Sequence, residues 1–305
     1  MPMNALRAAV LACAVWFCVQ AHARAPLVLL TDFGTQDGAV SAMKGVAYSV
    51  SQDLLISDLS HENPSIFAAA YRLYQAEQFW PKDTVFVAVV DPGVGTARLS
   101  VVLKTRTGHY FVGPNNGLLS LVAERDGIEA LREIDERVNR RKGSDESHTF
   151  HGRDVFAYTG ARLAAGVISF EQVGPSLAPQ MLIAIPYRKP EFAGDTVKGI
   201  IPVLDVQFGN VWTNIPKSLF DELHLGLGAP VRVRIFHTDR LIDDEVAPYR
   251  RTFGEVAIGK PLVYVNSLMN LAVALNQASY AAERKIQSGP DWFIELSSVP
   301  DATAH

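Results

Sequence analysis

The chain has 305 residues, of which 48% are hydrophobic and 20% charged, and its formal net charge is −4. This composition is typical of a globular protein with one large or two ordinary domains. Because Lys and Arg form no block along the sequence, we expect no nucleic-acid partner, since such binding relies on clustered basic side chains.

The first 23 residues have the three-part order of a secretory signal peptide. Arg7 precedes the apolar run AAVLACAVWFCV (8–19), and the sequence AHA (21–23) follows as a small-x-small cleavage site. The run is too short to span a bilayer comfortably, although an uncleaved anchor or a misassigned start codon is the alternative. We therefore expect cleavage after about Ala23 and a periplasmic or secreted protein.

Both cysteines, Cys13 and Cys18, lie inside this segment, so the mature chain would have none. That excludes thiolate zinc sites, iron–sulfur clusters and cysteine nucleophiles, and it suits an oxidising compartment. No later segment is long and apolar enough to cross a membrane, and the eight histidines show no paired metal-ligand spacing. We expect a soluble mature protein without a metal or another cofactor.

The first half alternates strand and helix patterns. We predict strands over 26–30, 54–59 and 84–90, helices over 38–50, 65–80 and 154–165, and a hairpin from 99–104 and 108–112. This order favours an α/β N-terminal domain, residues 25–186, with a mostly parallel, helix-covered sheet. The polar stretch 187–196 is the best linker candidate. Residues 197–299 then show short strands between turns, typical of a smaller, β-rich and barrel-like C-terminal domain.

Polar clusters follow the apolar strands, where open α/β sheets bind ligands. In chain order they are TDFGTQD (31–37), DPGVGTAR (91–98), GPNNG (113–117) and FHGRD (150–154). Each has a plain structural explanation. Asp37 would cap a helix, Asp91 and Arg98 would form an ion pair across a turn, and His151 would lie on the surface.

The order and wording of these clusters resemble the motifs of the S-adenosyl-L-methionine hydroxide adenosyltransferase family. The segment DVQFGNVWTN (205–214), Thr252-Phe253-Gly254 and Asn266-Ser267 fall in the same family order. The resemblance extends from about Leu27 to about Leu296. It implies an N-terminal α/β domain, a C-terminal barrel-like domain and a homotrimer, with each active site between the N-terminal domain of one subunit and the C-terminal domain of the next.

The resemblance also implies a reaction, the hydrolysis of S-adenosyl-L-methionine to adenosine and L-methionine. The Asp-Arg-His set of the family's hydrolases matches Asp91, Arg98 and His151. Arg98 and His151 would orient and polarise the water, and Asp91 would orient that pair. Two roles stay open: His151 accepts the proton of the water, or Arg98 mainly holds a hydroxide ion.

For the substrate, the resemblance assigns Asp37 to the ribose diol and Asn210 to adenine. Phe253 would stack on the base, although core packing is the commoner fate of an aromatic ring. Asp205 and Ser267 match positions at the methionine end. Backbone groups near Asn276 and Gln277 are further candidates for adenine.

Departures from the family pattern fall after Ser267, and they include Leu271 and Ala272 at the place where a Glu is often seen. Leu268 stands where the halogenases place an arginine, and Met269 stands where the hydrolases often have glycine. The sequence therefore leaves open what holds the carboxylate of the substrate. Two rival functions also stay open: an exported nucleoside-binding protein without turnover, and a chloride adenosyltransferase.

Overall fold

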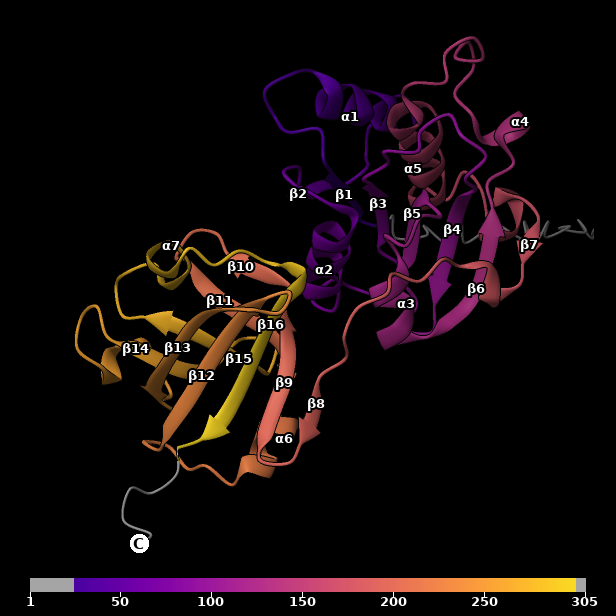
Figure 1. Cartoon of the computed structure of the whole chain (residues 1–305). Coiled ribbons are helices and arrows are strands. Elements are labelled where there is room, and N and C mark those ends of the chain that lie inside the picture. The colour runs from indigo at the N-terminus through magenta and orange to yellow at the C-terminus, as the bar shows by residue number, and fades with distance from the viewer. Residues whose placement is uncertain (1–24, 300–305) are drawn as a thin grey trace, which may run out of the picture.

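A computed structural model of the protein describes residues 25–299, which form an α/β part followed by a β-rich part (Figure 1). The predicted signal peptide, residues 1–23, lies outside the described residues. No helix within 25–299 is both long and apolar enough to cross a bilayer.

The N-terminal domain is built on one seven-stranded sheet. Its spatial order is β2 (Ile56–Ser60), β1 (Leu27–Thr31), β3 (Val85–Val89), β5 (Tyr110–Pro114), β4 (Ser100–Thr105), β6 (Ile128–Glu133) and β7 (Ser176–Leu177). Pairs β1–β2, β1–β3 and β3–β5 are parallel, whereas β4–β5, β4–β6 and β6–β7 are antiparallel. The sheet is therefore mixed, and our prediction of a mostly parallel sheet was wrong.

Connection length explains the mixed sheet. Helices α1 (Ala39–Val50) and α2 (Ile66–Glu77) provide the long crossovers that parallel neighbours need, and both were predicted. The predicted hairpin β4–β5 is joined by a short turn instead, so its strands must run in opposite directions.

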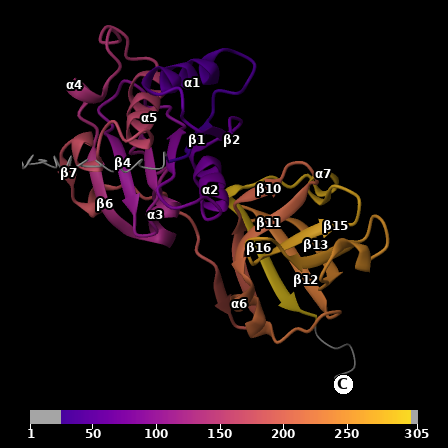
Figure 2. The same ribbon diagram turned by 180° about the vertical axis from the view of Figure 1, so that it is seen from behind.

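Helices cover both faces of this sheet, as Figures 1 and 2 show. Alternate residues of β1 point to opposite sides: Leu27 and Leu29 pack with α1 and α5 (Tyr158–Ala164). Val28 and Leu30 pack with α2 and α3 (Ser120–Asp126). A strand with both faces covered is apolar along nearly its whole length, which is why β1 reads LVLL before its last residue, Thr31, and is buried at every position.

The C-terminal domain consists of two antiparallel sheets that share one apolar core. One sheet has the order β10 (Val203–Asp205), β11 (Asn210–Pro216), β15 (Asn270–Leu275) and β14 (Pro261–Val265). The other has the order β13 (Arg240–Pro248), β12 (Pro230–His237), β16 (Gly289–Ser298), β9 (Thr196–Ile201) and β8 (Glu191–Ala193). The helices α6 (Lys217–Phe220) and α7 (Tyr280–Arg284) are short. The β-rich character is as predicted, but a barrel-like closure of the two sheets is not confirmed.

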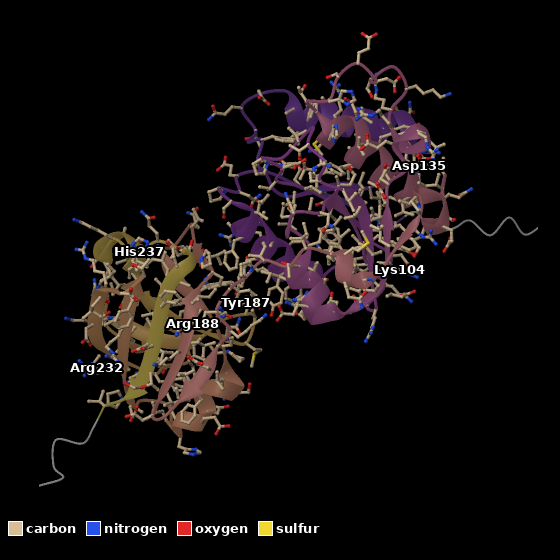
Figure 3. The ribbon with its side chains drawn as sticks, turned by 45° about the vertical axis from the view of Figure 1, so that its right-hand side comes forward. Lys104, Asp135, Tyr187, Arg188, Arg232 and His237 are labelled. Atoms are coloured by element: carbon tan, nitrogen blue, oxygen red, sulfur yellow. The ribbon has the colours of Figure 1, made fainter. Side chains whose placement is uncertain are left out.

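The stretch 187–196 connects the two domains and also contributes structure. Its residues Glu191–Ala193 form β8, which pairs antiparallel with β9 and so extends the second sheet. Tyr187, just before β8, lies between the two domains (Figure 3), whereas Arg188 lies over the ring of Phe293 in the C-terminal domain.

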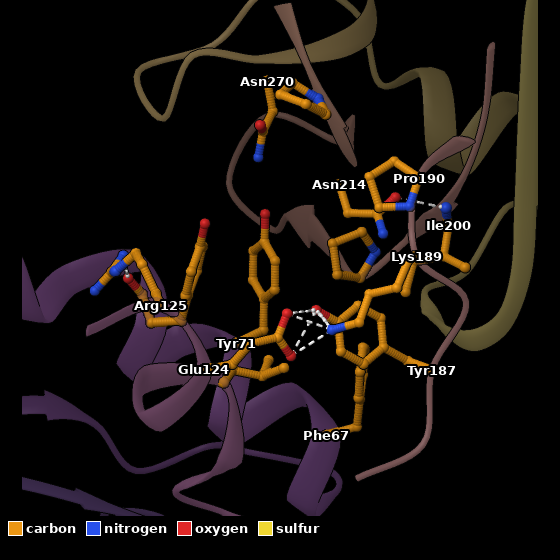
Figure 4. A pocket seen from close by; sticks show the side chains of 14 residues that line it. Phe67, Tyr71, Glu124, Arg125, Tyr187, Lys189, Pro190, Ile200, Asn214 and Asn270 are labelled. Atoms are coloured by element: carbon orange, nitrogen blue, oxygen red, sulfur yellow. Dashed lines mark hydrogen bonds and ion pairs between the residues drawn. The ribbon is translucent and has the colours of Figure 1, made fainter. Parts of the chain in front are cut away.

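A small cavity of about 290 Å³ lies at the domain junction, lined by residues of α2, α3, the connecting stretch and the C-terminal domain (Figure 4). The ring of Tyr71 points across it toward Asn270. Arg72 Nη2 donates to the Leu204 carbonyl over 2.9 Å, and Val203 and Trp212 pack against the apolar cluster that includes Tyr71. The domains are therefore joined by packed contacts as well as by the connecting chain.

Candidate active site

Arg98 is the centre of a three-residue contact formed from two loops, one that carries Asp91 and Arg98 and one that carries His151. Asp91 follows β3, Arg98 precedes β4, and His151 precedes a π-helix, η1 (Gly152–Ala157). Arg98 Nε donates to both carboxylate oxygens of Asp91 over 3.0 and 2.9 Å. Arg98 Nη2 lies 3.1 Å from His151 Nδ1. The structure thus brings together the three residues that the sequence singled out, and the Asp91–Arg98 ion pair also fits the plain structural explanation of that turn.

Neighbouring groups fix this arrangement. The carbonyl of Val90, next to Asp91, accepts from Asn116 Nδ2 over 2.9 Å, which gives the GPNNG turn a structural role. Arg98 Nη1 donates to Ser100 Oγ over 2.8 Å, and the guanidinium carbon lies 5.2 Å from the ring centre of the buried Phe156. Several side chains therefore hold Arg98 in one geometry.

The second ring nitrogen of His151 contacts another arginine that the sequence did not indicate. Arg140 Nη2 lies 3.1 Å from His151 Nε2, and the same guanidinium donates to Glu136 Oε2 from Nη2 and Nε over 2.8 and 3.1 Å. Arg140 directly follows α4 (Glu136–Asn139), and its side chain is nearly buried. Spacing alone could have suggested the Glu136–Arg140 pair, one helical turn apart, but not its contact with His151.

The pKa of His151 is lowered from its ordinary value. Burial is the largest cause, because it disfavours the charged imidazolium. The positive charges of Arg98 and Arg140 lower the pKa further, against the opposing effect of Glu136 and Asp91. His151 therefore favours the neutral form in this site.

The π-helix that starts after His151 brings two motifs into contact. Phe33 packs edge-on against Phe150, with ring centres 5.6 Å apart, and also lies over Gly152. π-Helical turns are rare and are found frequently at functional sites. Asp154 lies in the first turn of this π-helix, fully buried and paired with Arg153, so the helix that we predicted from residue 154 begins two residues earlier, at Gly152.

Two carboxylates lie in the first polar cluster. Burial raises the pKa of Asp32, and the negative charge of Asp91 contributes to the same shift. Because β1 and β3 pair in parallel, these two residues follow strands that end at the same edge of the sheet. Asp37 is exposed, and its Oδ1 accepts from the backbone N–H of Ala39 over 2.9 Å. The side chain of Asp37 thus accepts a hydrogen bond from the first turn of α1, although the N-cap residue itself is Gly38.

The C-terminal domain holds a separate pocket of about 790 Å³. It collects the remaining residues that the sequence singled out: Asp205, Asn210, Phe253 and Ser267, together with Asn276 and Gln277. Phe253 is not a core residue. It is 38% exposed, and its ring centre lies 4.9 Å from that of Tyr264. Burial raises the pKa of Tyr264 to about 12, so its hydroxyl stays protonated.

The tight turn from Asp205 to Asn210 shapes one wall of this pocket. Asn210 Nδ2 donates to Asp205 Oδ2 over 3.2 Å, and the Gly209 N–H donates to the Asp205 carbonyl. Gly209 has a φ of +71°, and a Cβ there would overlap Ser279. Glycine is therefore required at this position for both conformation and space.

The departures after Ser267 also have a structural explanation. Leu268 packs into the apolar cluster that joins the two domains, whereas Met269 is exposed and has a φ of +60°. Asn266 Oδ1 accepts from the backbone N–H groups of Leu268 and Asn270, which fixes this turn. In this chain the side chain at position 268 therefore contributes to apolar packing between the two domains.

The catalytic candidates and the pocket residues do not line a common site within one chain. Asp205, Asn210, Phe253 and Ser267 line the C-terminal pocket, which includes no residue of the N-terminal domain. Helix α4, next to Arg140, lies at the end of the N-terminal domain remote from the C-terminal domain (Figures 1 and 2). The two groups of residues are therefore on distant surfaces of the same chain.

Among residues 25–299, Glu77, His109 and Asp126 are grouped closely enough to ligate a metal ion. Arg125 already provides the positive charge there, because it pairs with both Glu77 and Asp126. His109 Nδ1 also lies 3.1 Å from Glu77 Oε2. We interpret this group as a buried ion-pair cluster that connects α2 with α3 and with the turn before β5.

Comparison with known families matches both domains. Residues 27–174 match the N-terminal domain, and residues 199–293 the C-terminal domain, of SAM hydroxide adenosyltransferase.

Curated relatives fall into two groups. The chain is 39% identical to the (R)-S-adenosyl-L-methionine hydrolase of Methanocaldococcus jannaschii, covering 69% of this chain and 73% of the relative. It is 38% identical to the enzyme of the same name from Salinispora tropica, covering 81% and 88%. It is 29% identical to a fluorinase of an Actinoplanes species, covering 86% and 95%.

Among solved structures, an uncharacterized conserved protein from Thermotoga maritima superimposes with a TM-score of 0.82 at 35% identity. The match covers 89% of this chain and 99% of that protein. The whole two-domain arrangement is therefore shared with a protein of known structure.

Proposed function

The chain belongs to the SAM hydroxide adenosyltransferase family, and we propose from this premise that it hydrolyses S-adenosyl-L-methionine to adenosine and L-methionine. Relatives named (R)-S-adenosyl-L-methionine hydrolase, 34–39% identical to the chain, support this activity. The observation that carries the proposal is the contact of Arg98 with both Asp91 and His151.

The proposed reaction makes modest chemical demands. Water or hydroxide attacks C5′ of the ribose in line with the C5′–S bond, and the bonding electron pair leaves with sulfur. Methionine is a neutral thioether, so no general acid is needed to expel it. The site must hold the nucleophile and remove its proton, and positioning alone lowers such barriers by roughly 7–11 kcal/mol in good cases. No cofactor is required.

In this proposal Arg98 and His151 orient the nucleophile, and Asp91 holds Arg98 in place. The Asp91 carboxylate is nearly buried and is engaged by two nitrogens of Arg98, so it serves as an anchor rather than as a base. The guanidinium favours a nearby anion, because an opposite charge within a few ångströms stabilises the ionised form. A hydroxide nucleophile is thus stabilised beside Arg98.

The C-terminal pocket is the proposed adenine and methionine site. Phe253 is exposed at its edge and offers a ring face for stacking on the base. Asn210 would contact adenine, Asp205 and Ser267 would hold the amino-acid end, and Asp37 of the N-terminal domain would bind the ribose diol. Substrate binding therefore needs groups from both domains.

We propose that the protein is a homotrimer, in which the N-terminal domain of one subunit meets the C-terminal pocket of the next. The distance between the two groups of residues within one chain supports this arrangement. Apolar side chains exposed beside the pocket, including Val206 and Phe208, are 83% and 65% accessible and would be covered by a neighbouring subunit.

Mixing inactive subunits tests the shared site. His151→Ala removes the N-terminal half of a site, and Asn210→Ala removes the C-terminal half. In a trimer assembled from equal amounts of both variants, a site is intact where the N-terminal domain of an Asn210→Ala subunit meets the C-terminal pocket of a His151→Ala subunit. Random assembly gives this pairing at about a quarter of the interfaces, so about a quarter of the wild-type activity is expected. Mixed subunits that stay as inactive as the separate variants would contradict a site between subunits.

The signal-peptide pattern supports a periplasmic or secreted location, which we propose together with cleavage after about Ala23. Because S-adenosyl-L-methionine is made in the cytoplasm, an exported enzyme would act on leaked or environmental substrate. Assay of the mature chain against a panel of 5′-substituted adenosines tests this point. Much faster turnover of another adenosyl compound would reassign the substrate.

The direct test of function is incubation of the mature protein with S-adenosyl-L-methionine, followed by chromatography of the products. Equal amounts of adenosine and methionine are expected. A 5′-chloro product in excess chloride would instead favour halide transfer, which the fluorinase relatives make the natural alternative. Tight adenosine binding by calorimetry with no product at all would favour a binding protein.

A further inference from the structure

The imidazole of His151 lies between two guanidinium groups, and this arrangement limits what the ring can do. Arg98 Nη2 lies 3.1 Å from Nδ1, and Arg140 Nη2 lies 3.1 Å from Nε2. Arginine only donates hydrogen bonds, and a neutral imidazole has one acceptor nitrogen and one N–H group. One arginine can therefore bond to the ring, while the other faces an N–H group.

Adding a proton to His151 would remove its only acceptor. Both ring nitrogens would then present N–H groups to arginine donors, and a third positive charge would be placed between two existing ones. Like charges at this separation disfavour the charged form strongly. The geometry opposes an imidazolium independently of burial.

Other groups than His151 fix the position of the Arg140 side chain. Glu136, one helical turn earlier, accepts two hydrogen bonds from its guanidinium, and the Arg140 side chain is 6% exposed. Its Nη1 lies 3.4 Å from the Ser144 carbonyl and 3.3 Å from the Ser147 carbonyl. A side chain so well anchored has a defined position next to His151.

From this arrangement we propose that Arg140 is a positioning residue that, with Arg98, keeps His151 uncharged, so that the imidazole does not accept the proton of the nucleophile and acts on it only through Arg98. The inference rests on the proposed function. The O–H bond of the water breaks with release of its proton to solvent, and its oxygen forms the bond to C5′. The C5′–S bond breaks with its electron pair on sulfur, so one proton is released per turnover.

The groups that face His151 are Arg98 and Asp91 from the loop between β3 and β4, Glu136 and Arg140 of α4 and its end, and His148 on its own loop. The His148 and His151 ring centres are 6.3 Å apart. Burial is the main cause that lowers the pKa of His151, Glu136 and Asp91 oppose it, and Arg98 and Arg140 both act in the direction of burial. Removing Arg140 takes away one of these positive charges and frees Nε2 for a proton.

The test is an NMR pH titration of the intact protein labelled with isotopes in the histidine rings, with His151 assigned by comparison with His151→Gln. In the wild type the His151 signals should stay those of a neutral ring as the pH falls well below the ordinary histidine range. Arg140→Met should move the midpoint to higher pH. The control is Arg137→Met, on the same helix but 88% exposed, which should titrate as the wild type does.

The pH dependence of kcat provides a second measurement. Arg140→Met should add an acidic limb to the profile, because a protonated His151 no longer accepts a hydrogen bond, while KM should change by no more than about twofold. Arg140→Lys keeps the charge without the planar group that bonds Glu136 and His151, and it should raise the midpoint less. If Arg140→Met does not fold, Arg140→Lys replaces it.

An unchanged His151 midpoint in both variants would overturn the proposal. Because the titration needs no turnover, its outcome is independent of the substrate. A shifted midpoint in a protein without hydrolase activity would support the role of Arg140 and refute the proposed function. Hydrolase activity with an unshifted His151 midpoint would support the proposed function and refute the role of Arg140.

Discussion

Phe33 lies so close to Gly152 that a Cβ at Gly152 would stand 3.0 Å from two carbons of its ring. Phe33 belongs to the loop after β1, and Gly152 is the first residue of the π-helix. The contact therefore links the loop that carries Asp37 to the segment that carries His151, and it fixes their separation.

Gly152→Ala should accordingly destabilise the protein by about 1–3 kcal/mol, because the added methyl group overpacks a site bounded by Phe33 and Phe150. Turnover should fall as well, since the shift reaches His151. Urea unfolding and steady-state kinetics measure the two effects. Gly38→Ala, where a Cβ would meet no atom within 4 Å, is the matched control and should leave stability within about 0.5 kcal/mol of the wild type. Equal stability of the two variants would be inconsistent with close packing at Gly152.

Arg98→Lys should reduce kcat by at least about 100-fold, although it conserves the charge. An ammonium group cannot reproduce the planar fork that bonds both oxygens of Asp91 and reaches His151. Single-turnover kinetics with saturating substrate separate this loss from weaker binding. The control is Arg232→Lys, whose pair with Asp244 is on the surface of the C-terminal domain, where Figure 3 labels Arg232. Near-normal kcat in Arg98→Lys would remove that residue from the reaction.

Phe253→Ala should raise KM for S-adenosyl-L-methionine by about tenfold or more, because stacking of a base on an aromatic ring is worth about 1–3 kcal/mol. Stability should change little, since the ring is partly exposed. Phe192→Ala is a suitable control, as Phe192 is 40% exposed on β8 and outside the pocket. A KM equal to that of the control would assign Phe253 to another role.

Folding stability should depend on pH through His151. Burial lowers the pKa of His151 in the folded protein from its ordinary value of about 6.5, so the unfolded chain binds the proton at higher pH than the folded chain. The free energy of unfolding should therefore decrease as the pH falls below about 6.5 and through the folded-state pKa. Above about pH 6.5 the contribution of the neutral His151 to the free energy of unfolding is fully present.

Comparison of urea unfolding at neutral and acidic pH measures this effect. His151→Gln should lose less stability than the wild type over the same interval, because the titrating ring is absent. His224→Asn is the control and should follow the wild type, as asparagine tolerates the left-handed backbone at that position. Parallel curves for all three proteins would mean that His151 titrates alike in the folded and unfolded chain.

Local patterns in the sequence predicted much of the fold. Strands β1 and β3 are recognisable because burial on both faces leaves an almost continuous apolar run, and helices α1 and α2 because burial on one face leaves a helical period. The order of strands in the sheet could not be predicted in this way. It depends on pairings such as β4 with β6, and no local pattern records which strands become neighbours.

The candidate site likewise contains residues that local motifs predicted and residues that only the folded structure reveals. Asp91, Arg98 and His151 stand in loops next to predicted strands and helices, so their motifs were recognisable, and the structure brings them into contact. Arg140 belongs to no motif, and it reaches His151 only through the path of the loop between α4 and η1. The assignment of Leu268 to the domain junction likewise depends on a contact between domains that sequence spacing does not encode.

The π-helix after His151 has a consequence for changes in chain length. A π-turn accommodates one residue more than an α-turn, so His151 and Phe156 keep their relative directions only at the present number of residues. Deleting a single residue between them would let the segment relax to ordinary α-helix and rotate everything before it by about 100° relative to the sheet. Related chains should therefore exchange residues in this segment far more freely than they gain or lose them.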